Sequence, residues 1–126
     1  MQAALILVVD DSNDVADSMA LILEMAGFRT GLAYDGRAAL AAIADKPPDA
    51  VLLDLSLPDI DGCELARQIR RGQTTPPLLI ALTGEGSPEK LAATRAAGFD
   101  AHLVKPVDPD VVTRLLIERG LQPQAG

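Results

Sequence analysis

The sequence predicts an α/β fold, a single-domain doubly wound arrangement in which five helices cover both faces of a five-stranded parallel sheet. Three observations predict it. The chain has 126 residues, which suits one compact domain. Short apolar segments alternate along the chain with longer segments that have helical spacing. The apolar segments are almost continuously hydrophobic, which is typical of strands buried on both faces of a parallel sheet.

Five short apolar segments are the predicted strands. The segment at Arg29–Ala33 is the weakest, because it contains polar residues and a glycine. Only 2% of the residues are aromatic, so we expect the core to consist of aliphatic side chains. The other four predicted strands are Leu5–Val9, Ala50–Leu53, Leu78–Leu82 and Ala101–Val104.

The first two predicted helices follow the first two strands. The first begins after Asp11 and stops near Gly27, because glycine favours the position just beyond a helix end. The second runs from about Gly36 to Ala44, with Asp35 as its N-cap. Helical spacing gives the first helix an apolar stripe that we expect to be buried, made of Val15, Met19, Ile22, Leu23 and Met25 or Ala26.

The last three predicted helices begin with recognisable capping residues. At the start of the third, Asp61 and Glu64 are three residues apart, as in a capping box. The fourth begins Ser87-Pro88-Glu89 and the fifth Asp108-Pro109-Asp110, each with proline at the first helical position. Their predicted buried residues are Leu65, Ala66 and Ile69 in the third helix, and Val111, Val112, Leu115 and Leu116 in the fifth.

Charge and composition argue against several classes of partner. The net charge of −7 disfavours direct binding to nucleic acid or to an anionic membrane, and it suits metal cations or basic protein surfaces. No apolar run approaches the ~20 residues that span a bilayer, and the N-terminus does not resemble a signal peptide. The single cysteine, Cys63, cannot form a disulfide within the chain, which fits a reducing compartment. We therefore expect a cytoplasmic protein.

The chain shows one domain and a short tail. There is no internal repeat and no low-complexity segment. We expect residues 1–121 to form the domain and residues 122–126 to form a C-terminal tail or linker stub. Since glutamine, proline and glycine dominate this tail, it is interpreted as the frayed end of the domain or the start of a linker.

Polar side chains follow four of the predicted strands. Asp10 and Asp11 follow the first, Asp54 the third, Thr83 the fourth and Lys105 the fifth. In an open parallel sheet, ligands bind just beyond the carboxyl ends of the strands, where the strand order reverses. Taken singly, the acidic pair could equally cap a helix, and Asp54 could be a turn residue. The convergence of three carboxylates, a hydroxyl and an ammonium group favours a functional site.

Three carboxylates close together need a cation, because they repel one another and lose hydration. Lys105 supplies one positive charge, and a hard divalent ion would supply two more. Magnesium suits a partly hydrated site in which all ligands are oxygens and one or two carboxylates bind directly. The only histidine is His102, and no histidine–cysteine cluster indicates zinc. The sequence therefore predicts a Mg²⁺ site.

Five motifs together resemble the receiver domain of two-component response regulators, in order and over essentially the whole chain. The resemblance implies a flavodoxin-like (βα)5 fold with strand order 2-1-3-4-5. It also implies a signalling module that promotes its own phosphorylation and dephosphorylation, and not an enzyme that turns over a metabolite. The motifs are VVDDS at 8–12, LLDLSLPDIDG at 52–62, ALTGEG at 81–86, AAGFDAHLVKP at 96–106 and the VDPD that follows.

The resemblance implies a phosphorylation site centred on Asp54. This residue would accept a phosphoryl group from a phosphohistidine of a histidine kinase or a histidine phosphotransfer protein. Lys105 would pair with the phosphoryl oxygens, since phosphoryl transfer depends mainly on positioning and charge neutralisation. The implied magnesium ligands are Asp11 and Asp54 directly, Asp10 through a bound water, and the backbone carbonyl of Ser56.

The resemblance also implies how phosphorylation is reported. Thr83 would hydrogen-bond the aspartyl phosphate and draw the loop Gly84–Ser87 with it, so that the surface of the fourth helix, fifth strand and fifth helix changes. His102 occupies a position where the family often has an aromatic residue. It is either an exposed polar residue at a strand edge or a replacement that makes this switch pH-sensitive. A cis peptide bond is implied between Lys105 and Pro106.

Two other functions are alternatives. An aspartate-nucleophile phosphatase uses similar chemistry, but its DxDxT motif follows the first strand, whereas Asp54-Leu55-Ser56 follows the third and lacks the second aspartate. A degenerate receiver that serves only as a scaffold would not need the complete set of site residues. The partners expected of a receiver are the phosphodonor protein and a downstream protein target or fused output domain, with a phosphorylation-dependent homodimer as a further option.

Overall fold

The structure, a computed structural model, describes residues 2–124. Its five strands form one parallel sheet in the order β2-β1-β3-β4-β5, which confirms the predicted fold and strand order. The strands are β1 Leu5–Val9, β2 Arg29–Ala33, β3 Ala50–Asp54, β4 Leu78–Thr83 and β5 Ala101–Val104. The helices are α1 Asn13–Met25, α2 Gly36–Asp45, α3 Gly62–Arg71, α4 Pro88–Ala97 and α5 Pro109–Glu118. Within residues 2–124, no helix is both long enough and apolar enough to cross a membrane.

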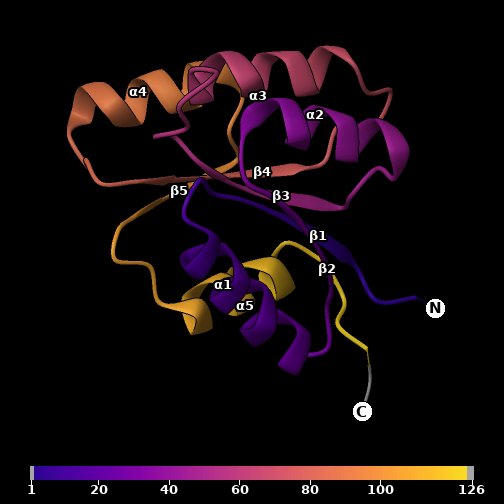
Figure 1. Cartoon of the computed structure of the whole chain (residues 1–126). Coiled ribbons are helices and arrows are strands. Elements are labelled where there is room, and N and C mark those ends of the chain that lie inside the picture. Colours follow the sequence, from indigo (N-terminus) through magenta and orange to yellow (C-terminus); the bar gives the residue numbers. More distant parts are fainter. Residues whose placement is uncertain (1, 125–126) are drawn as a thin grey trace.

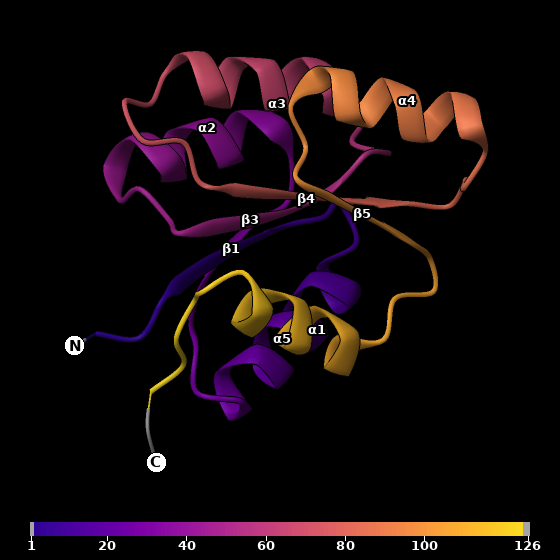
Figure 2. The same ribbon diagram turned by 180° about the vertical axis from the view of Figure 1, so that it is seen from behind.

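Helices cover both faces of the sheet. In Figure 1, α1 and α5 lie below the sheet, and α2, α3 and α4 lie above it. Figure 2 shows the same layers from behind. Successive residues of β1 belong to two different hydrophobic clusters: Leu7 and Val9 pack with α2 and α3, whereas Ile6 and Val8 pack with α1 and α5. Burial on both sides explains why the strands are continuously apolar.

Side-chain caps begin all five helices. Ser12 caps α1, since its hydroxyl accepts a hydrogen bond from the amide of Val15. The alternative in which Asp10 and Asp11 cap this helix is therefore wrong, and both carboxylates lie before it at the sheet edge. The other four caps are confirmed as Asp35, Asp61, Ser87 and Asp108.

The predicted apolar stripe of α1 is confirmed at Met19 and Leu23, which are buried, and is wrong at Val15, which is 51% exposed. Of the two residues given as alternatives at its end, Met25 is 79% exposed, whereas Ala26 is partly buried. The helix is rotated so that two alanines pack against the sheet, because small side chains allow a close approach there. The residues that it buries are Ala16, Met19, Ala20 and Leu23. Similarly, α5 buries Val112 and Leu116, while Val111 is exposed.

Three element ends also differ from the expectation. β3 and β4 each extend one residue further, through Asp54 and Thr83, because backbone pairing continues to the polar residue at the strand end. α2 continues to Asp45. Only one half of the capping box at Asp61 forms, since the side chain of Glu64 pairs with two arginines of its own helix.

Residues 122–124, the described part of the expected tail, are hydrogen-bonded to the domain. The carbonyl of Gln122 accepts a hydrogen bond from the amide of Ala4 at 2.9 Å, and the amide of Gln124 donates to the carbonyl of Gly27 at 2.8 Å. Residues 122–124 therefore differ from the frayed end that was expected. Residue 1 of the expected domain and residues 125–126 of the expected tail lie outside the described part of the chain.

The end of α4 depends on a glycine. Gly98 has a φ of +102°, in the left-handed region where side chains are strained. A Cβ atom at this position would lie 2.3 Å from Cδ of Arg70. The Arg70 guanidinium also donates a hydrogen bond to the Gly98 carbonyl at 3.2 Å. A side chain at residue 98 would therefore both strain the backbone and displace Arg70 from the junction between α3 and α4.

We expect Gly98→Ala to lower the free energy of unfolding by about 1–2 kcal/mol through the left-handed backbone alone, and further through displacement of Arg70. Gly120→Ala is the matched control, because Gly120 has a φ of +89° but a Cβ there would meet nothing within 4 Å. Urea unfolding of both variants measures the difference. If Gly98→Ala and Gly120→Ala lower the free energy of unfolding equally, Arg70 moves aside without an energetic cost.

Candidate functional site

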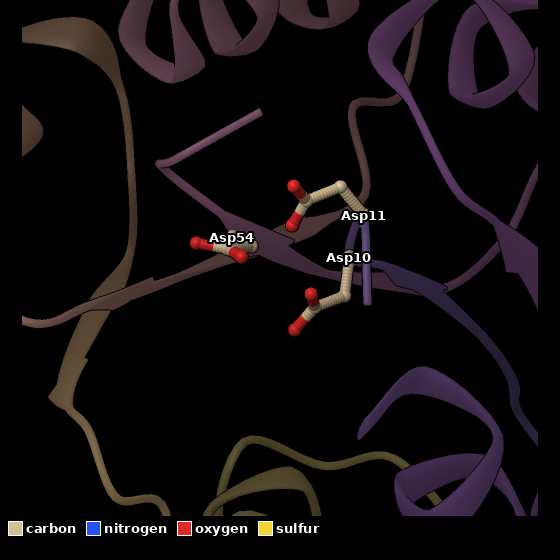
Figure 3. Close-up of side chains that lie close together, drawn as sticks. All are labelled: Asp10, Asp11 and Asp54. Carbon is tan, nitrogen blue, oxygen red and sulfur yellow. The ribbon is translucent and has the colours of Figure 1, made fainter. Parts of the chain in front are cut away.

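Three carboxylates meet at the carboxyl edge of the sheet. Asp10 and Asp11 directly follow β1, and Asp54 is the last residue of β3. β1 and β3 are neighbours with Val9 opposite Leu53, so the chain positions that follow bring Asp10 beside Asp54. Carboxylate oxygens of all three residues lie within 4.8 Å of one another. Figure 3 shows these side chains extending into the same region from the ends of the two strands.

Backbone amides hold the two inner carboxylates. Asp10 and Asp54 are only 2% and 1% exposed, whereas Asp11 is exposed. The amide of Ser12 donates to Asp10 Oδ1 and the amide of Ser56 donates to Asp54 Oδ1, both at 2.9 Å. Asp54 is therefore both a turn residue and a site residue. Its Oδ1 accepts the hydrogen bond from the Ser56 amide, and its Oδ2 faces Lys105.

Lys105 neutralises part of this negative charge. Its Nζ lies 3.0 Å from Asp54 Oδ2, and its side chain is 35% exposed. The Lys105 amide donates to the carbonyl of Thr83 at 2.7 Å, which ties the end of β5 to the end of β4. The peptide bond between Lys105 and Pro106 is cis.

The two buried carboxyl groups have opposite pKa shifts. Burial raises the pKa of Asp10, and the charge of Asp54 adds to this effect although the Ser12 amide opposes it. Burial would also raise the pKa of Asp54, but the amide of Ser56 and the ammonium of Lys105 outweigh it, so its pKa lies below the ordinary value. Asp54 is therefore the inner carboxylate that is held ionised.

A cleft of about 620 Å³ opens over these groups. It is lined by most of the predicted site residues, namely Asp10, Asp11, Asp54, Ser56, Lys105 and Pro106. The sequence reasoning missed its apolar wall, which consists of Val15, Met19, Leu82 and Val107. The spacing of Val15 and Met19, four residues apart on one helix face just after the acidic pair, is the signal that could have found two of them.

Two predicted site residues do not line this cleft. Thr83 is 4% exposed, and its hydroxyl accepts a hydrogen bond from the amide of Glu85 at 3.1 Å. His102 lies against a different cavity, between α4 and β5, and its Nδ1 is 3.2 Å from the hydroxyl of Thr94. His102 is partly buried and hydrogen-bonded, so the expectation of an exposed polar residue at a strand edge is wrong.

The donor set fits a hard divalent cation. The three grouped side chains offer only carboxylate oxygens, which suits magnesium and does not suit zinc with its preference for nitrogen and sulfur. One carboxylate is exposed and borders the open cleft, so that water can complete a coordination shell. In the described part of the chain, these residues are the one such group of acidic, histidine or cysteine side chains.

Comparisons with known proteins agree with this geometry. Residues 6–117 match the family model of the response regulator receiver domain. The chain is 44% identical over 101 residues to the response regulator MprA of Mycolicibacterium vanbaalenii, covering 80% of this chain and 43% of that protein. It is 38% identical over 112 residues to the phosphate regulon transcriptional regulatory protein PhoB of Pseudomonas aeruginosa, covering 87% of this chain and 49% of that protein. A CheY-like receiver domain protein from Methanospirillum hungatei has a similar structure, with a TM-score of 0.87, 31% identity and 94% of each chain covered.

The chain spans less than half the length of these two curated relatives. Receiver domains are phosphoacceptor switches and not classical enzymes, and two-component receivers have histidine kinases as partners. An acidic triad such as Asp10, Asp11 and Asp54 is typical of their magnesium-binding site. Family match, fold and acidic cleft lead to one conclusion: this chain belongs to the response regulator receiver domain family and is a phosphorylatable two-component receiver.

Proposed function

We propose that Asp54 accepts a phosphoryl group from a phosphohistidine of a histidine kinase or a histidine phosphotransfer protein. The observation that carries the proposal is the position of the Asp54 carboxylate, which lines the open cleft 3.0 Å from Lys105 Nζ and beside two further carboxylates. A lowered pKa keeps this group ionised, so it can act as a nucleophile without a separate base.

The proposed transfer exchanges one bond at phosphorus for another. A carboxylate oxygen of Asp54 attacks phosphorus, and the bond from phosphorus to the donor imidazole breaks while the new phosphorus–oxygen bond forms. Lys105 stabilises the equatorial phosphoryl oxygens, because its ammonium is already directed at Asp54. The aspartyl phosphate is an acyl phosphate, so we also propose that the same site promotes its hydrolysis and makes the signal reversible.

Four groups of this chain would hold magnesium. Asp11 and Asp54 would bind directly, Asp10 would bind through a water, and Ser56 would contribute its backbone carbonyl. When bound, magnesium would neutralise charge on the transferring phosphoryl group. Burial and the nearby Asp54 charge raise the pKa of Asp10, and a bound cation would favour its ionised form.

Thr83 is the proposed reporter of phosphorylation. Its hydroxyl oxygen accepts a hydrogen bond from the Glu85 amide, which leaves the hydroxyl hydrogen to be donated to a new acceptor on Asp54. A rotation of the whole Thr83 side chain toward that acceptor would carry the oxygen away from the Glu85 amide and let the loop after β4 move. The output surface proposed is that of α4, β5 and α5, through which the domain would act on a downstream protein, a fused output domain or a second copy. This surface has exposed apolar side chains at Leu91, Val104, Val111 and Ile117.

We also propose the extent of the unit and its compartment. The family match from 6 to 117 and the end of α5 at Glu118 support a receiver unit of residues 1–121 followed by a tail or linker stub at 122–126, of which Gln122 and Gln124 bond back to the domain. A cytoplasmic location is proposed together with the phosphodonor, because the two proteins must meet in one compartment. Direct binding to nucleic acid or membrane is not part of the proposal, given the net charge of −7.

Asp54→Ala is expected to abolish phosphorylation while leaving the fold intact, since this carboxylate adds charge repulsion to the site more than it adds packing. Intact-protein mass after incubation with acetyl phosphate measures the gain of a phosphoryl group, with magnesium and with a chelator. Wild type should gain one group only with magnesium. Asp45→Ala, which removes an exposed carboxylate at the end of α2, is the control and should be labelled like wild type.

The outcomes of this experiment separate the three functions. Labelling of Asp54→Ala equal to wild type would exclude Asp54 as acceptor. A phosphatase would consume acetyl phosphate through many turnovers without a lasting mass gain. A second arm with a phosphorylated histidine kinase as donor identifies a degenerate scaffold, which would gain no mass from either donor.

Asp11→Ala should weaken magnesium binding by at least about tenfold, because it removes a directly ligating carboxylate and one negative charge. Asp14→Ala is the matched control, since it removes the same charge from the exposed first turn of α1. Calorimetric titration with magnesium measures both dissociation constants. If the two variants bind magnesium equally well, Asp11 acts only through long-range charge and is not a ligand.

Thr94 connects His102 to α4. Its hydroxyl lies 3.0 Å from the carbonyl of Leu91 and 3.2 Å from His102 Nδ1, and in the arrangement where the hydroxyl donates to Leu91, Nδ1 carries the hydrogen and donates to Thr94. Nε2 is then an unprotonated acceptor, and it is buried with no hydrogen-bond partner among the described residues. Burial, together with the nearby charge of Lys90, lowers the pKa of His102. We propose that His102 occupies the switch position in this neutral form.

A lowered pKa means that the unfolded chain takes up a proton on His102 before the folded chain does. The stability contributed by the neutral ring is therefore complete above about pH 6.5, the ordinary histidine value, and is lost as the pH falls through the folded value. We expect His102→Gln to lose less stability than wild type between about pH 8 and pH 5. Urea midpoints across this range measure the effect, and parallel curves for the two proteins would contradict it.

A further inference from the structure

Asp59 connects the loop after β3 to the start of a different helix. Its Oδ1 accepts a hydrogen bond from the amide of Gly36 at 2.9 Å, and its Oδ2 accepts one from the amide of Arg37 at 3.0 Å. The N-cap of the same helix, Asp35, accepts from the amide of Ala38 at 2.7 Å. The first three amides of α2 are thus bonded by two carboxylates, and one of these comes from a residue 22 positions or more away in the sequence.

Apolar contacts hold the same loop at both sides of Asp59. Leu57 is 8% exposed and belongs to the core between the sheet, α2 and α3. Ile60 packs over Gly36 so closely that a Cβ there would lie 3.0 Å from it. Gly62 lies against Leu55, and a Cβ at Gly62 would be 2.6 Å from that side chain. These contacts bring the loop to the start of α2, and the Asp59 carboxylate bonds it there.

The loop that Asp59 holds also carries Ser56. The side chain of Ser56 is exposed. Among the described residues, the one hydrogen bond that Ser56 makes runs from its amide to Asp54 Oδ1. Ser56 lines the cleft, three residues before Asp59. With no buried side chain of its own, Ser56 depends on its neighbours in the loop for its position.

We propose that Asp59 is a positioning residue for the phosphorylation site. By bonding the loop to α2, it fixes the backbone of Ser56, so that the amide stays on Asp54 and the carbonyl stays available as a magnesium ligand. This inference rests on the proposed function for the role of Ser56 and Asp54, and it adds a residue that touches neither the phosphoryl group nor the metal.

A structural role alone would make Asp59 equivalent to Asp35. Both carboxylates bond amides in the first turn of α2, and both stabilise the positive end of that helix. Only Asp59 belongs to the loop that reaches the cleft. Asp35→Ala is therefore the matched control for Asp59→Ala. Asp59→Asn is the conservative variant, because its remaining oxygen can still accept one of the two amides.

The experiment makes four measurements on wild type and these variants. Hydrogen exchange of the Ser56 amide, followed by NMR in the metal-free protein, reports the bond to Asp54. Calorimetric titration gives the magnesium dissociation constant. The rate of phosphorylation by acetyl phosphate, measured against magnesium concentration, separates the apparent magnesium constant from the maximal rate. Urea unfolding ranks the stability of all the variants.

We expect Asp59→Ala to bind magnesium about tenfold more weakly, as is usual when a group that orients a ligand is lost. Its Ser56 amide should exchange faster, while its maximal rate at saturating magnesium stays near that of wild type. Asp59→Asn should have a magnesium dissociation constant and a Ser56 exchange rate between those of wild type and Asp59→Ala. Asp35→Ala should lose stability but keep the wild-type magnesium constant and Ser56 exchange.

The proposal is overturned if Asp59→Ala matches Asp35→Ala in both the magnesium constant and Ser56 exchange. If Asp59→Ala does not fold, the same comparison between Asp59→Asn and Asp35→Ala decides. Failure of the proposed function has a different signature, namely no mass gain in wild type or a normal gain in Asp54→Ala. In that case, exchange of the Ser56 amide still shows whether Asp59 holds the loop.

Discussion

The site depends on the pairing of one ammonium with an excess of carboxylates at a largely buried sheet edge. Asp10 and Asp54 are almost inaccessible, and a charge in such a place is costly unless it is paired and hydrogen-bonded. Asp54 has both kinds of partner, the Ser56 amide and the Lys105 ammonium. Asp10 has an amide but no cation of its own, and its pKa is raised. A divalent cation held by these carboxylates would supply further positive charge at the edge where the phosphoryl group would be transferred.

The parallel sheet makes this concentration of charge possible. Because all five strands run in the same direction, their carboxyl ends share one edge, and the residues that follow them converge without any local sequence relationship. The apolar clusters on the two faces fix the strands, so the polar residues at their ends have little freedom to move apart. Backbone bonds beyond the strands, such as that from the Lys105 amide to the Thr83 carbonyl, extend this rigidity to the site itself.

The loops at the same edge have two different constructions. The loop after β3 is held by Leu57, Ile60 and Asp59, which suits a segment that must keep Ser56 in place. The loop after β4 includes two glycines, and a Cβ at Gly84 would meet nothing within 4 Å. It is linked to Thr83 by the bond from the Glu85 amide to the Thr83 hydroxyl, and its Gly86 lies against Val104, where a Cβ would be 3.0 Å from that side chain. A charge change at Asp54 that releases the Glu85 bond would move the loop after β4 without disturbing the loop after β3.

The sequence by itself determined the strands, the helix starts and the acidic edge, because each of these follows from local chemistry. Apolar runs, capping residues and strand-end carboxylates are read over a few neighbouring positions, and Asp10, Asp11, Asp54 and Lys105 were all found in that way. Only the tertiary structure decided how α1 turns, with Val15 toward the cleft and Ala16 toward the sheet, since both flanks of that helix are apolar. It also decided that Asp59 bonds α2 and that Thr94 holds His102. Contacts between segments so far apart depend on the path of loops and the close packing of side chains, which hydrophobic periodicity does not encode.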